Sequence, residues 1–93
     1  DYIISMVAEH FDLSVDDLAG NKRNSKIVTP RQIAMYLMRN LTNLPLKEIG
    51  EEFGGRNHAT VLSSIRKVEE LLKSDPDIAA TVRDITSNIN SKN

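Results

Sequence analysis

The sequence lacks cysteine and tryptophan altogether, and its 93 residues include only two Phe and two Tyr. Without cysteine the chain has no disulfide bond, no thiolate zinc site and no cysteine nucleophile. The two histidines, His10 and His58, lie far apart in the sequence, which is a poor basis for a metal site. Paired carboxylates, a nucleophile beside a base and a phosphate loop of P-loop spacing are also missing. We therefore expect neither an enzyme nor a cofactor in this chain.

Long hydrophobic runs are missing too, since no apolar segment approaches the roughly 18 residues of a membrane span. The first residues also lack the basic end and cleavage site of a secretory signal. We expect a cytoplasmic chain without a membrane partner, or a piece cut from something larger. A chain of 93 residues can build one hydrophobic core and not two, so residues 1–93 are expected to form a single domain.

The net charge of −1 hides an uneven distribution of charge along the chain. Residues 1–17 carry a charge of −5, residues 18–68 carry +6 and residues 69–93 carry −2. A basic segment in a nearly neutral chain produces a local positive potential, which is typical of a phosphate-binding face. The alternative is a solvated surface on which the charges merely segregate.

Apolar residues recur at helical spacing and no segment shows the alternation of a strand, which predicts an all-α fold. Ser14 is expected to cap the second helix with Asp17 as its reciprocal partner, and Asp75 is expected to cap the last helix, which Pro76 opens. Leu41 and Leu72 are expected to be core residues of the third and fifth helices. The predicted bundle of about six helices is Trp-repressor-like. Its helices are expected at about residues 2–11, 14–18, 29–41, 46–53, 57–73 and 76–89.

Residues 29–32 form the strongest helix start in the sequence. Thr29 can cap a helix, Pro30 suits the first helical position and Gln32 completes a capping box. The free backbone N–H groups of such a helix start can bind phosphate, with Arg31 and Gln32 reinforcing the site. Simple capping is the structural alternative.

Residues 21–28 show no periodicity and hold several polar or basic side chains, so we expect a loop. Homeodomains use an extended arm that carries arginine to reach into the minor groove. The basic residues of this loop are therefore candidate DNA contacts, although such loops are more often only exposed. These residues are Lys22, Arg23 and Lys26.

A short helix, a glycine turn and a longer helix at about residues 46–73 have the layout of a helix-turn-helix, whose second helix enters the major groove by its N-terminal end. Gly50 in the short helix costs about 1 kcal/mol relative to alanine, which suggests that another backbone packs closely there. If Val61, Ile65 and Val68 face the core, small and polar residues point outward near the start of the long helix. These outward residues are Asn57, Ala59, Thr60 and Ser63, with Lys67 a turn beyond.

Those side chains suit base edges, although plain helix packing would give the same layout. Asn57 could hydrogen-bond a base, Thr60 could do so or touch a thymine methyl group, and Ala59 could only make the methyl contact. His58 could give a hydrogen bond or a methyl contact.

The segments TPRQIAMYL at 29–37, LT at 41–42, EIG at 48–50 and above all FGGRNHATVL at 53–62 resemble the C-terminal DNA-binding domain of the bacterial replication initiator DnaA. The resemblance covers essentially the whole chain. It implies binding of double-stranded DNA at DnaA boxes of the TTATNCACA type at the replication origin, in the bacterial cytoplasm and at the nucleoid. It also implies that ATP belongs to an AAA+ domain absent here, and that the isolated domain is monomeric, with oligomerisation through absent domains.

Carried over by position, the resemblance implies that Arg23 is a minor-groove residue. The family usually has Asp where Asn57 stands and Thr where Ala59 stands, so we expect a relaxed or altered box preference. The implied recognition cluster is Arg56, Asn57, His58, Ala59 and Thr60. Residues implied to contact the DNA backbone or to have a positioning role are Arg31, Gln32, Arg39, Leu46 and Lys47.

Two other functions stay open from the sequence. A Trp-repressor-like transcriptional regulator would share the helix-turn-helix layout, but it would need a dimer surface and an effector pocket that are not evident. A helical protein-interaction module could use the basic segment to dock an acidic partner. Competition with duplex DNA would separate this module from a DNA-binding domain.

Overall fold

The computed structural model describes residues 2–91, and this part of the chain forms helices and no strand. The all-α class is therefore confirmed, with the number of helices that the sequence predicts. None of the described helices has the length and hydrophobicity to span a bilayer. In chain order, the helices are α1 Tyr2–His10, α2 Val15–Ala19, α3 Ser25–Leu41, α4 Leu46–Glu52, α5 His58–Ser74 and α6 Pro76–Ser91.

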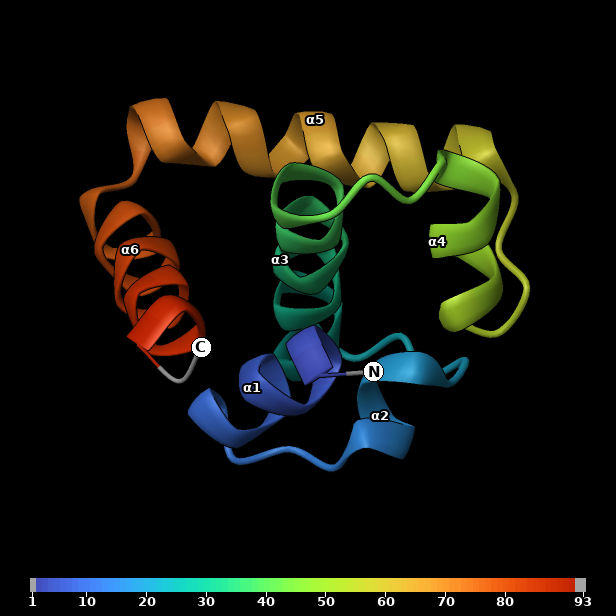
Figure 1. Ribbon diagram of the computed structural model, residues 1–93, viewed down its shortest axis with the longest axis horizontal. Coiled ribbons are helices and arrows are strands. Elements are labelled where there is room, and N and C mark those ends of the chain that lie inside the picture. Colours follow the sequence, from blue (N-terminus) through green and yellow to red (C-terminus); the bar gives the residue numbers. More distant parts are fainter. Residues whose placement is uncertain (1, 92–93) are drawn as a thin grey trace.

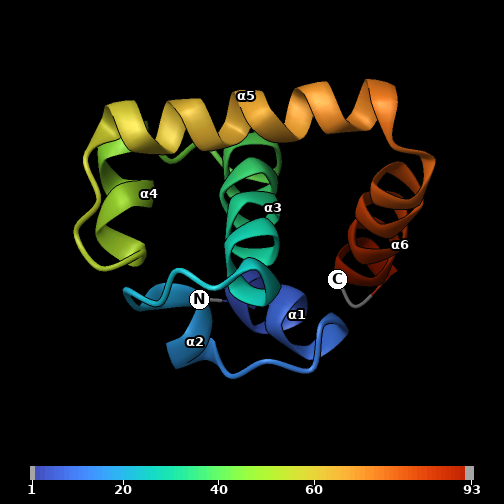
Figure 2. The ribbon, with the colours of Figure 1, turned by 180° about the vertical axis from the view of Figure 1, so that it is seen from behind.

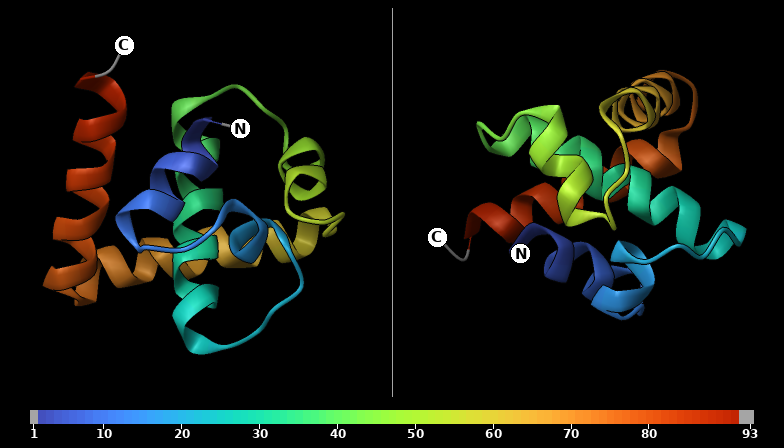
Figure 3. Two further views of the ribbon diagram at one scale, coloured as in Figure 1. Left: turned by 90° about the horizontal axis from the view of Figure 1, so that it is seen from below. Right: turned by 90° about the vertical axis from the view of Figure 1, so that its right-hand side faces the viewer.

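Helix α3 is the centre of the fold, and α1, α2, α4 and α5 all pack against it. Helix α5 lies on one side of α3 and crosses it between its ends, while α1 and α2 lie on the opposite side (Figures 1, 2 and 3). Helices α4 and α6 lie at opposite ends of α5, on either side of α3 (Figure 3). Helix α3 thus packs against both helices of the helix-turn-helix, α4 and α5.

The core between these helices is mainly aliphatic, and Phe53 lies in it with no exposed surface. Val61, Ile65 and Val68 of α5 are buried as predicted. Leu41 was expected in the core and is instead 38% exposed, because the end of α3 extends past the side chains that cover it. Leu72 is only partly buried and packs on the edge of the core.

The start of α3 differs from the sequence prediction, because the helix begins at Ser25 and not at Thr29. The N–H groups of Ile27 and Val28 donate to the carbonyl oxygen of Asn24 at 3.0 and 3.1 Å. Pro30 therefore lies inside the helix, where it has no N–H to donate. Ile27 is 4% exposed, and its burial favours the extra turn. The predicted capping box at residues 29–32, and the predicted loop beyond Asn24, are wrong.

Two other predicted helix starts are confirmed. The Ser14 hydroxyl accepts from the Asp17 amide at 2.9 Å, and the Asp17 carboxylate accepts from the Ser14 amide at 3.3 Å. Asp75 accepts from the amides of Asp77 and Ile78 at 3.0 and 3.3 Å, which caps α6. These local signals depend on neighbouring residues alone, so the sequence reveals them directly.

Gly50 meets another stretch of backbone, as predicted. Its carbonyl oxygen accepts from the amides of Gly55 and Arg56, each at 3.0 Å. A side chain at Gly50 would overlap the carbonyl of Arg56. Gly54 and Gly55 have φ angles of +78° and +80°, a region that glycine adopts without strain. The turn between α4 and α5 is thereby folded tightly onto α4.

Gly50→Ala tests this contact, because the sign of its effect on the free energy of unfolding depends on whether backbone lies against Gly50. At an open helix position the change would stabilise the fold by about 1 kcal/mol. Here the new methyl group meets the backbone of the turn, so we expect overpacking to lower the free energy of unfolding by about 1–3 kcal/mol. Urea unfolding of Gly50→Ala and of Glu51→Ala, an exposed control in the same helix, measures the difference. A more stable Gly50→Ala protein would show that the turn is not held this closely.

Candidate nucleic-acid interface

The first turn of α5 is fixed by its own polar atoms. The Asn57 Oδ1 accepts from the Thr60 amide at 2.9 Å, so Asn57 is the N-cap and the helix proper begins at His58. Arg56 donates from Nη1 to the carbonyl of Phe53, which ties the turn to the end of α4. Asparagine is a favoured N-cap residue, because its side chain satisfies an N–H that the helix leaves unpaired.

The predicted outward face of α5 is exposed, as expected from the helical spacing. Asn57, His58, Ala59 and Thr60 are all exposed at the start of the helix. Ser63 and Lys67 continue this exposed row, and the Ser63 hydroxyl donates to the carbonyl of Thr60 at 3.0 Å. The structure thus gathers these six side chains on one surface, and their part in reading DNA stays a prediction.

An open groove of about 320 Å³ lies beside this surface. It joins the segment before α3, the first half of α3 and the start of α5, which are far apart in the sequence. No acidic side chain of the described residues lines it. We call it the arginine groove, and its polar lining is Arg23, Arg31, Gln32, Arg56, Thr60, Ser63 and Ser64.

A second hollow shares Arg56 with the arginine groove and lies against the turn between α4 and α5. Lys47, Asn57 and His58 line it together with Glu51. Lys47, predicted to contact DNA, is therefore brought to the start of α5 on the side of α4. Arg56 connects the two hollows, so the predicted contacts from three helices form one continuous surface.

Other predicted contacts lie outside both hollows. Arg39 is exposed near the end of α3 and donates to the carbonyl of Leu44 at 3.3 Å. Lys26 lines a different hollow with Phe11 and Pro30. Leu46 is half-buried against the core. Nothing in these placements tests their roles, but they do not join the surface around Arg56.

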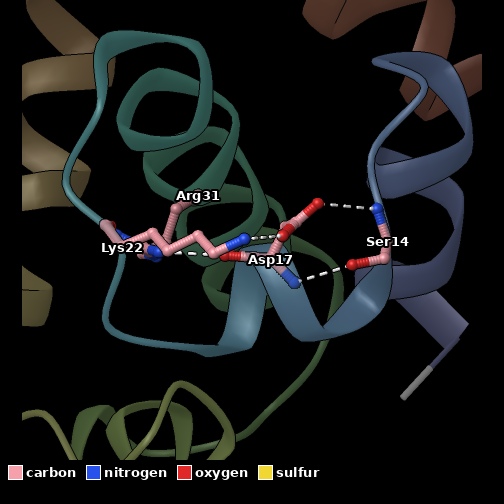
Figure 4. Close-up of polar contacts among 4 residues, drawn as sticks. All are labelled: Ser14, Asp17, Lys22 and Arg31. Atoms are coloured by element: carbon pink, nitrogen blue, oxygen red, sulfur yellow. Dashed lines mark hydrogen bonds and ion pairs between the residues drawn. The ribbon is translucent and has the colours of Figure 1, made fainter.

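Arg31 lies inside the protein, with 5% of its surface exposed. Its Nε donates to the carbonyl of Leu18 at 2.7 Å, Nη1 to that of Lys22 at 2.7 Å and Nη2 to that of Asp17 at 3.0 Å. Figure 4 shows the guanidinium beside the end of α2. The expectation that Arg31 reinforces a phosphate site at a helix start is corrected, because that helix start does not exist and its charged group points to carbonyl oxygens.

The electrostatics of the groove favour an anion. Burial lowers the pKa of Arg31, and the nearby positive charge of Arg56 lowers that pKa further. Burial likewise lowers the pKa of Arg56, with Arg23 adding repulsion. Three guanidinium groups therefore repel one another within a groove that holds no carboxylate. A phosphate group placed there would relieve this repulsion.

Asp17 holds the segment that leads into the groove. Its carboxylate accepts from the Lys22 Nζ at 2.9 Å, and that bond, followed by those with Ser14, lowers its pKa. A lowered pKa means that these contacts stabilise the fold above the usual pKa of an aspartate, and that they are lost as the pH falls through the lowered value. The Lys22 ammonium is therefore held by Asp17 at neutral pH.

Comparison with known proteins shows the family of the chain. Residues 1–68 match the family model described as the bacterial DnaA protein helix-turn-helix. The chain belongs to this DnaA family. Its match ends within α5, after the turn and all the side chains at the start of that helix.

Individual DnaA proteins show the same relationship. The chromosomal replication initiator protein DnaA of Nostoc punctiforme is 49% identical over 88 residues, which are 95% of this chain and 19% of that protein. DnaA of Leifsonia xyli is 51% identical over 94% of the chain and 18% of its own length. DnaA of Thermus thermophilus is 51% identical over 87% of the chain and 19% of its own length. The chain thus spans about a fifth of the length of these relatives.

Sequence reasoning missed two local roles. The capping of α5 by Asn57 has a recognisable signal, since asparagine directly before a helix is a favoured cap. The inward position of Arg31 has a signal as well, because Ile27, Ala34 and Met35 lie on the same helix face and are all buried. That pattern becomes visible only when α3 is read from Ser25.

Proposed function

We propose that this chain binds double-stranded DNA in a sequence-specific manner, as the origin-recognition module of a DnaA-type replication initiator. The preferred sites would be DnaA boxes related to TTATNCACA. The observation that carries this proposal is the arginine groove, which lies beside the exposed first turn of α5 and contains no acid among the described residues. Membership of the DnaA helix-turn-helix family supports it.

The exposed start of α5 and the arginine groove suggest how a duplex would lie on the protein. The start of α5 would enter the major groove, where Asn57, His58, Ala59 and Thr60 can approach base edges. Arg23, at the other edge of the arginine groove, would reach the adjoining minor groove. Contacts to phosphate would come from exposed polar groups around them, namely Lys22, Gln32, Lys47, Arg56, Ser63 and Lys67.

This proposal assigns the chain a binding role and no chemical step. Because the chain spans about a fifth of its relatives, any ATP-dependent step would belong to other parts of such a protein. Oligomerisation would likewise depend on those other parts.

Titration of a labelled duplex that carries the box tests the proposal, with a scrambled duplex of equal length as the comparison. We expect tighter binding to the box and a steep loss of affinity with salt, because several phosphates are neutralised. Equal affinity for both duplexes would reduce the function to non-specific DNA binding. Failure to bind either duplex would favour the alternative of an acidic protein partner.

Arg23→Ala tests the minor-groove contact. We expect the change to weaken binding to the box by about 1–3 kcal/mol, the range of a good base contact. Arg83→Ala is a matched control, because Arg83 is exposed on α6, away from the arginine groove. Fluorescence anisotropy at one fixed salt concentration measures both variants. Equal affinities for the two variants would show that Arg23 is merely solvated.

The two positions at which the chain departs from the family pattern predict a change in box preference. The Asn57 Oδ1 is used by the cap of α5, so its amide nitrogen is the group left to meet a base, as a donor. In Asn57→Asp one oxygen can keep the cap while the other accepts from a cytosine amino group. We expect this variant to shift the preference toward cytosine by about 1–3 kcal/mol at one base pair. It should also stabilise the free domain slightly, because a negative charge is favourable at a helix N-terminus.

Ala59→Thr adds a hydroxyl group and should act on a neighbouring base pair. Both variants are measured on a panel of boxes with single substitutions, at fixed salt. The ratio of specific to non-specific affinity is the quantity to compare, since the new charge in Asn57→Asp also repels phosphate. An unchanged rank order of boxes would show that residues 57 and 59 do not read bases.

The isolated chain should bind one box as a monomer. The exposed start of α5 and the arginine groove form one continuous surface, which suits one copy on one box. Sedimentation of the complex counts the copies on a duplex that carries a single box. Two copies on one box would contradict this expectation and would favour a dimeric regulator.

A further inference from the structure

Arg31 makes contacts that the DNA-binding surface itself does not require. Its guanidinium is buried and donates three hydrogen bonds to carbonyl oxygens, at 2.7, 2.7 and 3.0 Å. Two of these carbonyls, those of Asp17 and Leu18, belong to α2. The third belongs to Lys22, the residue directly before Arg23. One side chain of α3 therefore holds both the end of α2 and the segment at 21–24, which we call the arm.

The end of α2 depends on such a donor. Gly20, its C-cap, has an extended backbone with φ −86° and ψ −162°, and not the left-handed conformation that usually closes a helix end. The last carbonyls of a helix have no partner within it, and burying them unpaired is costly. Arg31 supplies N–H groups to two of them. The guanidinium of Arg31 thus adds two hydrogen bonds to the packing of α2 against α3.

The arm has little else to fix it. It runs for only four residues between Gly20 and the start of α3 at Ser25, and all four are exposed. At its end the Asn24 carbonyl accepts from the first turn of α3, and nearer its start Lys22, with its side chain 66% exposed, forms an ion pair with Asp17. Exposed ion pairs contribute little, about 0–1 kcal/mol, because water competes for both charges. The partly buried hydrogen bond from Arg31 to the Lys22 carbonyl is therefore the principal restraint on the residue next to Arg23.

We propose that Arg31 is a positioning residue for DNA binding, which holds the arm from inside the protein so that Arg23 is presented at the arginine groove. The inference rests on the proposed DNA-binding function and adds a residue that need not touch DNA. A restrained arm loses less conformational freedom on binding than a free one, which raises affinity without a new contact. The planar fork of an arginine can reach three carbonyls together, whereas a lysine ammonium cannot reproduce this geometry.

The decisive experiment separates the minor groove of the box from its major groove. Replacing adenine with 2,6-diaminopurine adds an amino group in the minor groove and leaves the major-groove edge of the base pair unchanged. Replacing guanine with 7-deazaguanine removes a major-groove acceptor instead. Affinities for the plain TTATNCACA box and for the two modified boxes are measured for the wild-type chain, Arg31→Met, Arg31→Lys, Arg23→Ala and Arg31→Met combined with Arg23→Ala.

Wild-type binding should fall about 5- to 100-fold with diaminopurine, the range of one base contact. Arg31→Met should bind the plain box about 5- to 50-fold more weakly, and diaminopurine should weaken it no further. Its sensitivity to 7-deazaguanine should equal that of the wild-type chain. The double variant should bind no more weakly than Arg23→Ala, since both changes remove the same contact. Arg31→Lys should behave like Arg31→Met, because charge alone does not hold the arm.

Other outcomes overturn the inference. If Arg31→Met keeps the full sensitivity to diaminopurine, Arg31 does not position Arg23. If it loses sensitivity to both modifications equally, the defect is general and not confined to the arm. If diaminopurine has no effect on the wild-type chain, no minor-groove contact exists to be positioned. Failure of the proposed function looks different, because the wild-type chain would then not distinguish the plain box from a scrambled duplex. Arg83→Met, a change of an exposed arginine on α6, controls for the loss of charge.

If the Arg31 variants do not fold, a measurement on the wild-type chain tests whether the arm is restrained. Backbone order parameters from NMR should reach about 0.85 for residues 21–24, as in the helices, and the Arg31 Nε proton should exchange slowly. Values below about 0.6 for these residues would show that the arm is flexible in spite of Arg31. That result would overturn the inference without any substitution.

Discussion

The candidate nucleic-acid interface depends on the close contact between Gly50 of α4 and the turn that leads into α5. The carbonyl oxygen of this glycine accepts from two consecutive amides, those of Gly55 and Arg56, and no side chain can be placed between the two segments. This contact sets where α5 begins relative to α4. It also places Arg56 between the two hollows that Lys47 and Arg23 line from opposite sides. A turn held less closely would move all these groups relative to one another.

The positive charges of the arginine groove oppose folding and favour the binding of an anion. Three arginines share one groove without a carboxylate among the described residues, so the free protein contains repulsion that its own side chains do not relieve. An aliphatic core around α3 offsets this cost, and the hydrogen bonds of Arg31 compensate for its burial. The nearly neutral net charge therefore conceals a surface that a polyanion would neutralise, and relief of the repulsion would contribute to the proposed affinity for phosphate.

Local patterns predicted most of the fold. The caps at Ser14 and Asp75, the buried face of α5 and the close packing at Gly50 each follow from a few neighbouring residues, and the structure confirms them. The start of α3 could not be predicted from neighbouring residues alone. Thr29 and Pro30 carry a strong local signal for a helix start, but α3 begins a turn earlier at Ser25, and Ile27 in that turn is buried. Tertiary packing overrode the local preference.

The wrong predicted start of α3 also hid the role of Arg31. With α3 beginning at Thr29, Arg31 lies in the first turn, where a basic residue points toward phosphate. With α3 beginning at Ser25, Arg31 falls one turn after Ile27 and one turn before Met35, on the face that packs inward. A charged residue on a buried face needs acceptors, and in this fold only main-chain carbonyls of α2 and the arm supply them. The register of one helix thus decides whether the guanidinium of Arg31 faces the surface or the main-chain carbonyls of α2 and the arm.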